Sequence, residues 1–141
     1  MGPLFQVCIV VDDLEATMTQ FTEALGFRWT ERAQRVIDGD TVTVVFSIEG
    51  PPHIELVDGS GASGVWATGG EPRVHHLGFW SDDFSRDCAQ LERAGLVLRS
   101  TTERIERKNA LYDSGVCGTK LELIATDRRP WFLDLVSRPA S

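Results

Sequence analysis

Four side chains that can bind a divalent ion or move a proton occupy corresponding places in two halves of the chain. Gln6 and His76 lie near the start of two strand-like runs, FQVCIVVDD and HHLGFWSDD, and Glu55 and Glu122 lie in two later runs. Two carboxylates, one amide oxygen and one imidazole form a mostly oxygen set, which suits an octahedral divalent ion such as Zn, Ni, Co or Mn. Such an ion stabilises the negative charge that forms when a proton leaves a carbon next to a carbonyl, and a glutamate can act as the base.

Strand periodicity predicts that these four side chains share one face. Successive side chains of a strand point to opposite faces, so Val7 and Ile9, packed under the helices, turn Gln6 to the other side. The same alternation turns three further residues to that face, namely Glu55, His76 and Glu122. If the two halves close this face into a trough, the four polar side chains converge. Two carboxylates in a partly apolar trough repel each other unless an ion or a proton lies between them.

The elements that carry these residues repeat in the order strand, helix, strand, strand, strand. Asp13 and Asp83 are suitable caps for the two helices. The apolar helix faces correspond position by position: Leu14, Met18 and Phe21 match Phe84, Cys88 and Leu91. A register kept over a strand, a cap and a helix face indicates an internal repeat. We therefore expect an α+β fold of two tandem βαβββ modules, whose mixed sheets form an open trough with the helices on the outside.

The expected organisation is a single domain over residues 1–141. Module 1 spans residues 4–58 and module 2 spans residues 73–126, joined by a Gly-, Ser- and Ala-rich linker over residues 59–72. In module 1, a hairpin around Asp38 and Gly39 is expected to join strands over residues 27–37 and 41–48. The C-terminal tail over residues 127–141 is expected to dock back as a short helix.

Composition excludes several classes of function. The chain has 141 residues, of which 42% are hydrophobic and 25% charged, which is typical of one compact globular domain. A net charge of -7 without Lys or Arg clusters argues against binding to nucleic acid or to an anionic membrane. No apolar run approaches the ~20 residues that cross a bilayer, and the chain start lacks a signal-peptide pattern. Cys8, Cys88 and Cys117 show no disulfide spacing, so we expect reduced thiols and a cytoplasmic location.

Each half resembles a module of the vicinal oxygen chelate superfamily, also called the glyoxalase/bleomycin-resistance/dioxygenase superfamily. The most similar segments are HHLGFWSDD, GTKLELI and FQVCIVVDDLEATMTQFTEALGF, and the resemblance covers residues 4–126. It implies that the start of each first strand and the middle of each fourth strand supply the metal ligands. Those positions are Gln6, Glu55, His76 and Glu122. One Gln, one His and two Glu form a combination that the glyoxalase I branch uses.

The residues and the resemblance together predict a metal-dependent, glyoxalase-like lyase or isomerase that abstracts a proton next to a carbonyl through an enediolate intermediate. Glu122 and Glu55 are the expected catalytic residues. A single His argues against the two-His, one-carboxylate iron site of ring-cleaving dioxygenases. No arginine pattern identifies a glutathione site, and DSGVCG replaces the Asp-Pro-Asp-Gly type turn of many relatives. The substrate, the choice of metal and the need for glutathione therefore stay open.

The alternative is a metal-free protein of the bleomycin-resistance kind, which would give antibiotic resistance by sequestering an aromatic or cationic natural product. Trp66, Trp80 and Trp29 would then contact the guest. An enzyme of secondary metabolism that catalyses a rearrangement or an epimerisation is a chemical variant of the first hypothesis. A sequestering protein has no need for two facing glutamates, so the metal-ligand set separates the two classes.

The expected pocket for a small-molecule substrate or ligand is lined by His53, Trp80, Tyr112 and Trp66. His53 shares the strand face of Glu55, whereas His75 is expected to point to the helix side or a strand end. Phe46 is a further candidate, and Arg107 and Lys108 are interpreted as solvated charges. Exposed strand edges favour a homodimer, and the sequence leaves open whether one chain or two chains complete the site.

Overall fold

The computed structural model describes residues 1–37, 39–104 and 107–141, and all of their side chains except those of residues 37, 65, 101–104 and 107. The strands are β1 (Leu4–Val11), β2 (Ala33–Ile37), β3 (Asp40–Phe46), β4 (His53–Asp58), β5 (Arg73–Ser81), β6 (Val97–Arg104), β7 (Arg107–Asp113) and β8 (Lys120–Ala125). The α-helices are α1 (Leu14–Leu25), α2 (Phe84–Arg93) and α3 (Arg129–Leu135), and the short 3-10 turns are η1 (Gly64–Trp66) and η2 (Thr126–Arg128).

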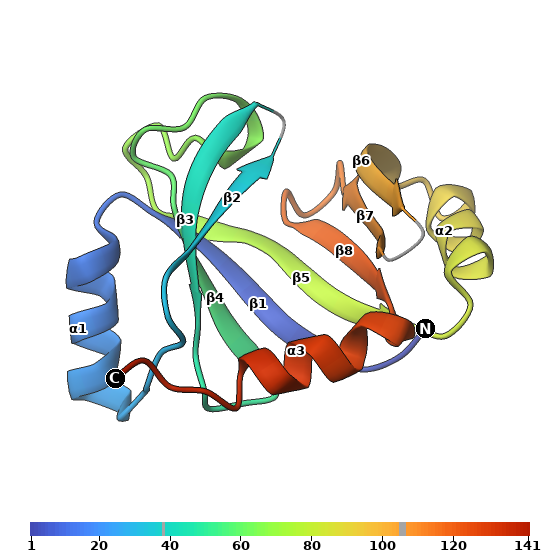
Figure 1. Ribbon diagram of the computed structural model, residues 1–141. Helices are drawn as coiled ribbons and strands as arrows, with labels where there is room; N and C mark the ends of the chain where they lie inside the picture. Colours follow the sequence, from blue (N-terminus) through green and yellow to red (C-terminus); the bar gives the residue numbers. More distant parts are fainter. Residues whose placement is uncertain (38, 105–106) are drawn as a thin grey trace.

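All eight strands join in one sheet with the order β2-β3-β4-β1-β5-β8-β7-β6. Within each half the first and fourth strands are parallel, β1 with β4 and β5 with β8. The halves meet at the centre, where β1 and β5 pair antiparallel and Val7 lies opposite Leu77. The sheet curls so that β2 and β3 rise on one side and β6, β7 and β8 on the other (Figure 1). The expected α+β fold of two tandem βαβββ units around a trough is confirmed.

Helices α1 and α2 lie at the two outer flanks of the sheet (Figure 1). Asp13 caps α1 by accepting a 2.9 Å hydrogen bond from the backbone N–H of Ala16. Asp83 caps α2 in the same way, accepting from the backbone N–H of Arg86 at 3.2 Å. Each helix buries its apolar face against its own half of the sheet, in clusters that include Leu14 and Phe84. Helices α1 and α2 therefore cover the convex face of the sheet, and the third helix, α3, packs against the opposite, concave face.

Helix α3 lies on the concave side and therefore departs from the expectation that all helices lie outside. Its Phe132 is buried in one cluster with Phe5, Phe46 and Trp80. Alternation along β1 places Phe5 on the helix side, but a register shift between Leu4 and Gln6 disrupts the pairing with β5. The ring of Phe5 stacks on Trp80 with ring centroids 3.9 Å apart. The tail thus docks as the short helix that the sequence predicted, and it covers part of the trough.

Strand β2 is shorter than the predicted strand over residues 27–37. The segment before it packs beneath α1, where the indole N–H of Trp29 donates to Thr22 Oγ1 at 3.0 Å. Glu49 holds the neighbouring Arg28 by accepting from its backbone N–H at 2.8 Å and from its side-chain Nε at 2.9 Å. Trp29 therefore does not lie in the trough, where the sequestration hypothesis placed it. Asp38, in the predicted hairpin turn, lies outside the described residues.

The structure also tests the expectations on membrane-spanning segments and cysteines. In the described part of the chain, no helix is long and apolar enough to cross a membrane. Cys8, Cys88 and Cys117 are all free thiols.

Candidate functional site

The side chains of Gln6, Glu55, His76 and Glu122 meet on the concave face. His76 Nε2 lies 2.9 Å from Glu122 Oε2 and 3.5 Å from Glu55 Oε2. Gln6 Nε2 lies 3.1 Å from His76 Nε2 and donates a 2.8 Å hydrogen bond to Glu122 Oε2. Four strands of one chain, β1, β4, β5 and β8, supply these groups. One chain is therefore sufficient to bring the four side chains together.

Strand register explains the convergence. Gly78 on β5 lies opposite Gln6 on β1 and opposite Glu122 on β8. It has no side chain, so Gln6 can reach across the strand pair towards Glu122. A Cβ atom at position 78 would lie 2.5 Å from Gln6 Cγ, which is shorter than any normal contact. Gly78 thus provides the space in which the amide meets the carboxylate.

We expect Gly78→Ala to weaken the binding of a divalent ion by about tenfold or more, because the added methyl displaces a side chain that helps to form the cluster. The measurement is a Co²⁺ titration followed by absorption spectroscopy, with circular dichroism to verify folding. Gly61→Ala is the matched control, because a Cβ at Gly61 meets no atom within 4 Å. A folded Gly78→Ala variant with unchanged Co²⁺ affinity would contradict the role assigned to Gly78.

Electrostatics in the cluster favour a positive charge. Glu55 Oε2 is buried without a hydrogen-bond partner in the described part of the protein, and a carboxylate in that state is destabilised. Burial alone lowers the pKa of His76, but the Glu122 carboxylate, whose Oε2 lies 2.9 Å from His76 Nε2, more than offsets burial and holds that pKa well above its ordinary value. The two carboxylates therefore favour a cation between them. The cluster's oxygen and imidazole donors fit a divalent ion, with the Gln6 amide oxygen as a further donor once the amide rotates.

A second buried group lies behind His76. His75 Nδ1 is 2.9 Å from His76 Nδ1, and the ligand atoms of Cys8, His75 and His76 all lie within 4.8 Å of one another. Burial, with a smaller contribution from the Glu55 carboxylate, raises the pKa of Cys8 to about 12. Cys8 is therefore a neutral thiol near pH 7, and a metal would have to displace its proton.

The sequence did not predict this second group. The sequence analysis placed His75 on the helix side or at a strand end, and the structure places it near the start of β5, which begins at Arg73. A register shift opposite Cys8 and Ile9 changes the course of the strand. His75 is 1% exposed and stacks on Trp66 with ring centroids 4.3 Å apart. The only sign of this group in the sequence was the pair of adjacent histidines. A register shift interrupts the two-residue alternation of the strand, so the sequence pattern does not predict where His75 points.

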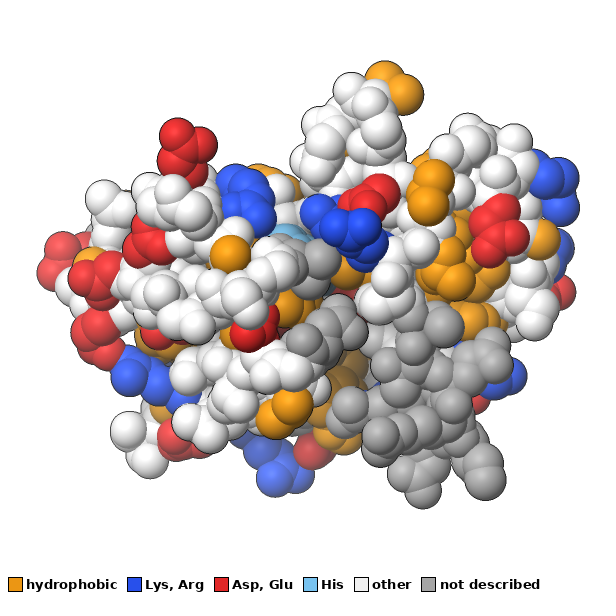
Figure 2. Space-filling model, turned by 90° about the horizontal axis from the view of Figure 1, so that it is seen from above, with side chains coloured by type: hydrophobic (Ala, Val, Ile, Leu, Met, Phe, Trp, Pro, Cys, Tyr) orange, Lys and Arg blue, Asp and Glu red, His pale blue; other side chains and the backbone are white. Residues whose placement is uncertain are grey.

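A cavity of about 300 Å³ lies next to the four-residue cluster. Its lining includes the cluster itself, aromatic and aliphatic side chains, and the polar residues Arg35, Ser100, Lys108, Asn109 and Arg128. Seen from above, acidic side chains are spread over the α1 side, and basic side chains, with an acidic one beside them, flank a histidine surface near the middle of this face (Figure 2). The cavity thus combines the potential metal ligands of the cluster with a lining of apolar, neutral polar and basic side chains.

Two of the four predicted pocket residues line this cavity. Trp80 lies on β5 and Trp66 lies in the linker, where its Nε1 is buried without a partner among the described residues. His53 lies beneath α3 instead, with its Nδ1 2.9 Å from Ser47 O. Its ring packs edge-on against Phe132.

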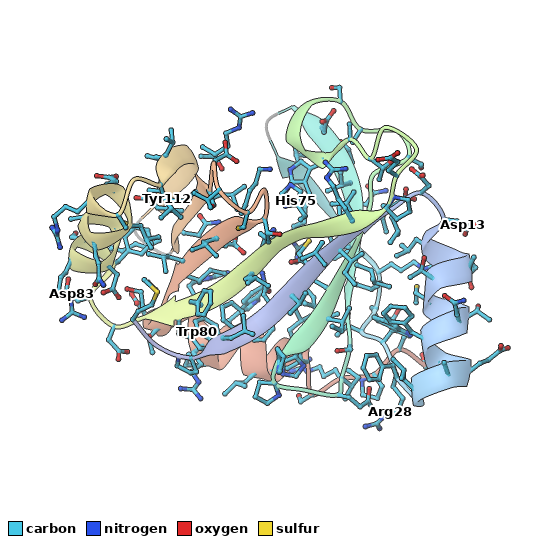
Figure 3. The ribbon with its side chains drawn as sticks, turned by 180° about the vertical axis from the view of Figure 1, so that it is seen from behind. Asp13, Arg28, His75, Trp80, Asp83 and Tyr112 are labelled. Atoms are coloured by element: carbon cyan, nitrogen blue, oxygen red, sulfur yellow. The ribbon has the colours of Figure 1, made fainter. Side chains whose placement is uncertain are left out.

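Tyr112 also lies outside the cavity. It is on the α2 side of the sheet (Figure 3), and its hydroxyl donates to Glu92 Oε1 at 3.0 Å. Burial raises the pKa of this phenol above its ordinary value. The preceding residue of β7, Leu111, lines the cavity, so strand alternation turns Tyr112 to the helix layer. Tyr112 is therefore part of the α2 core.

Several cavity residues were missed by the sequence analysis. Lys108 lines the cavity, although the sequence suggested a solvated charge, while the side chain of Arg107 lies outside the described residues. Arg35 and Arg128 come from β2 and η2, which lie far apart in the sequence. Phe46, a candidate from the sequence, is confirmed as a lining residue. Only the curvature of the sheet and the position of α3 reveal the others.

Comparison with known proteins adds a family and a fold. The family model described as Glyoxalase/Bleomycin resistance protein/Dioxygenase superfamily matches residues 5–112. Methylmalonyl-CoA epimerase from Mycobacterium tuberculosis superimposes with a TM-score of 0.67 at 19% identity, over 86% of this chain and 86% of the epimerase. A methylmalonyl-CoA epimerase variant from Streptomyces coelicolor, in complex with 2-nitronate-propionyl-CoA, gives 0.69 at 17% identity, over 89% and 97%. A hypothetical protein from Bacillus halodurans gives 0.68 at 14% identity, over 87% and 93%. No curated protein sequence matches the chain.

Proposed function

Since the chain belongs to the Glyoxalase/Bleomycin resistance protein/Dioxygenase superfamily, we propose that it is a metal-dependent isomerase or lyase that removes a proton from a carbon next to a carbonyl. Membership of the family confirms the resemblance indicated by the sequence. The observation that carries the proposal is the convergence of two carboxylates, an amide and an imidazole beside a cavity. The epimerases that share the fold support isomerisation, because an epimerase inverts one carbon centre and a proton transfer achieves that.

The proposed ligands are Gln6, Glu55, His76 and Glu122. When bound, a divalent ion (Zn, Ni, Co or Mn) supplies the positive charge that stabilises an enediolate or enolate oxygen. Glu122 is held by Gln6 and His76, and it orients the cluster. Glu55 Oε2 has no hydrogen-bond partner in the described structure and is available to accept the substrate proton. For an isomerisation that inverts a carbon centre, one carboxylate would accept the proton from one face, and the other carboxyl group, in its protonated form, would deliver a proton to the opposite face.

The sequestration hypothesis receives less support. That hypothesis required an acidic surface that attracts a cationic guest. Arg35, Lys108 and Arg128 line the cavity instead, and their positive charges would repel such a guest. The hypothesis also gives no reason for two carboxylates to share a buried site. The structure needs no second copy to assemble the site, so the expected homodimer stays a prediction.

The proposal is tested by metal binding to protein purified without a histidine tag. We expect about one equivalent of Co²⁺, Ni²⁺, Zn²⁺ or Mn²⁺ to bind at micromolar concentrations, measured by calorimetry. His76→Ala should abolish saturable binding, while Arg93→Ala, a change on the surface of α2, should not alter it. If none of the four ions binds to the wild-type protein, the proposed chemistry loses its basis.

A further inference from the structure

The cavity lining contains two groups of charged residues of opposite sign. Among the described lining residues the only acidic ones are Glu55 and Glu122, and both belong to the buried cluster. The basic lining residues are Arg35, Lys108 and Arg128. Arg35 and Arg128 are half-buried and Lys108 is exposed, whereas Gln6 and His76 are buried. Lys108 is thus more exposed than any residue of the four-residue cluster, in which Gln6, Glu55 and His76 are buried and Glu122 is half-buried.

The general charge of the protein does not explain this arrangement. The chain has 21 acidic and 14 basic residues, so a random surface would present more acid than base. Arg35 comes from β2 and Lys108 from β7, near opposite ends of the strand order, and Arg128 precedes α3. The curl of the sheet brings the two outer parts to one cavity (Figure 1). Three cations from three separate segments therefore line one cavity, and basic side chains are the groups that recognise carboxylates and phosphates.

The cavity lining also contains several aromatic side chains. The aromatic lining residues are Phe46, Trp66, Trp80, Trp131 and Phe132. Trp131 is 43% exposed, and the guanidinium of Arg128 lies 4.4 Å from the centre of its ring. Val36, another lining residue, is 74% exposed. Exposed apolar side chains in a cavity lining are available to contact a ligand, and aromatic walls favour a planar apolar body.

We propose that the substrate is an aromatic carbonyl acid. Its enolisable carbonyl lies at the Gln6, Glu55, His76 and Glu122 cluster, its ring lies against the aromatic wall, and its carboxylate pairs with Arg35 and Lys108. The assignment of the carbonyl end rests on the proposed function, whereas the ring and carboxylate subsites rest on the lining residues alone. The class excludes a cationic guest and a small aliphatic keto acid as good ligands.

Three probes separate these elements. The first is 4-oxo-4-phenylbutanoate, which has a phenyl ketone, an enolisable CH₂ group and a carboxylate. The corresponding amide lacks the negative charge, and levulinate replaces the phenyl ring with a methyl group. We expect the first probe to bind about tenfold more tightly than either analogue, measured by tryptophan fluorescence and calorimetry. Equal affinity for the amide, equal affinity for levulinate, or no saturable binding of the first probe would each overturn the inference.

Variants test the assigned cations. Arg35→Gln and Lys108→Gln should each weaken 4-oxo-4-phenylbutanoate binding several-fold and leave binding of the neutral amide unchanged. Arg93→Gln, on the surface of α2, is the matched control and should change neither affinity. If both cavity variants bind the carboxylate as the wild-type protein does, the anion subsite is wrong.

A second readout distinguishes this inference from the proposed function. Exchange of the CH₂ protons of 4-oxo-4-phenylbutanoate with deuterium from the solvent is followed by NMR, with added Mn²⁺ removed before detection. Tight binding without catalysed exchange, in a protein that binds no divalent ion, would retain the ligand class and reject the enzyme. Metal binding without preference for the aromatic carboxylate would retain the metal site and reject the ligand class.

Discussion

Glu122→Gln lowers the affinity of the protein for divalent ions by about 100-fold, if the carboxylate of Glu122 binds the ion. Glu122 Oε2 accepts from Gln6 Nε2 at 2.8 Å and lies 2.9 Å from His76 Nε2, so it connects the two halves of the cluster. The substitution keeps the shape of the side chain and removes its negative charge. Mutations in the shell around a metal cost about 10- to 100-fold in affinity, and loss of a charged ligand lies at the upper end.

The measurement is calorimetric titration of Co²⁺ and Mn²⁺ into the variant and the wild-type protein. Glu23→Gln is the matched control, because Glu23 is exposed on α1, far from the concave face. On any substrate found, the turnover of the Glu122→Gln variant should fall by about 10²- to 10⁴-fold, the range for a group that transfers a proton. Wild-type metal affinity and turnover in a folded Glu122→Gln variant would remove Glu122 both as a ligand and as a catalytic residue.

The sequence predicted the repeated elements and the shared face because both depend on short-range patterns. Apolar side chains such as Leu14 and Phe84 recur at helical spacing after acidic caps, and the structure contains both helices. Alternation in β4 and β8 turned Glu55 and Glu122 to the concave face. Register in the parallel pairs then places both carboxylates near β1 and β5. Local rules were sufficient for these positions.

The sequence failed where position depends on interruptions in the strands and on contacts between distant segments. Register shifts between β1 and β5 accompany the packing of Phe5 on Trp80 and of His75 on Trp66, since each shift breaks the two-residue alternation. Tyr112 was assigned to the pocket by its type, although alternation with Leu111 sends it under α2. Arg35 and Lys108 meet at one cavity only because the sheet curls. No local pattern records that curvature.

The two modules differ in their covering, although their elements match. The concave face of the first half packs against α3, where Phe46 contacts Phe132 with ring centroids 5.4 Å apart. The cavity extends to β7 and β8 of the second half, through Leu111 and Ile124. The C-terminal helix therefore breaks the symmetry of the repeat. This asymmetry gives the ligand cavity one aromatic side, although the four polar residues come from equivalent strands.

Phe132→Ala is expected to destabilise the protein by about 3–5 kcal/mol, the usual cost of truncating a buried Phe. Phe132 is 3% exposed, and its ring centre lies 5.0 Å from that of Phe5 and 5.7 Å from that of Trp80. Its loss leaves a void between α3 and the sheet, so the free energy of unfolding measured in urea should fall. Leu133→Ala is the control: Leu133 is 50% exposed on the same helix, and its truncation should cost less than about 0.5 kcal/mol. Equal effects of the two substitutions would show that α3 does not pack on the concave face in solution, and the aromatic wall assigned to the substrate would then lose one of its sides.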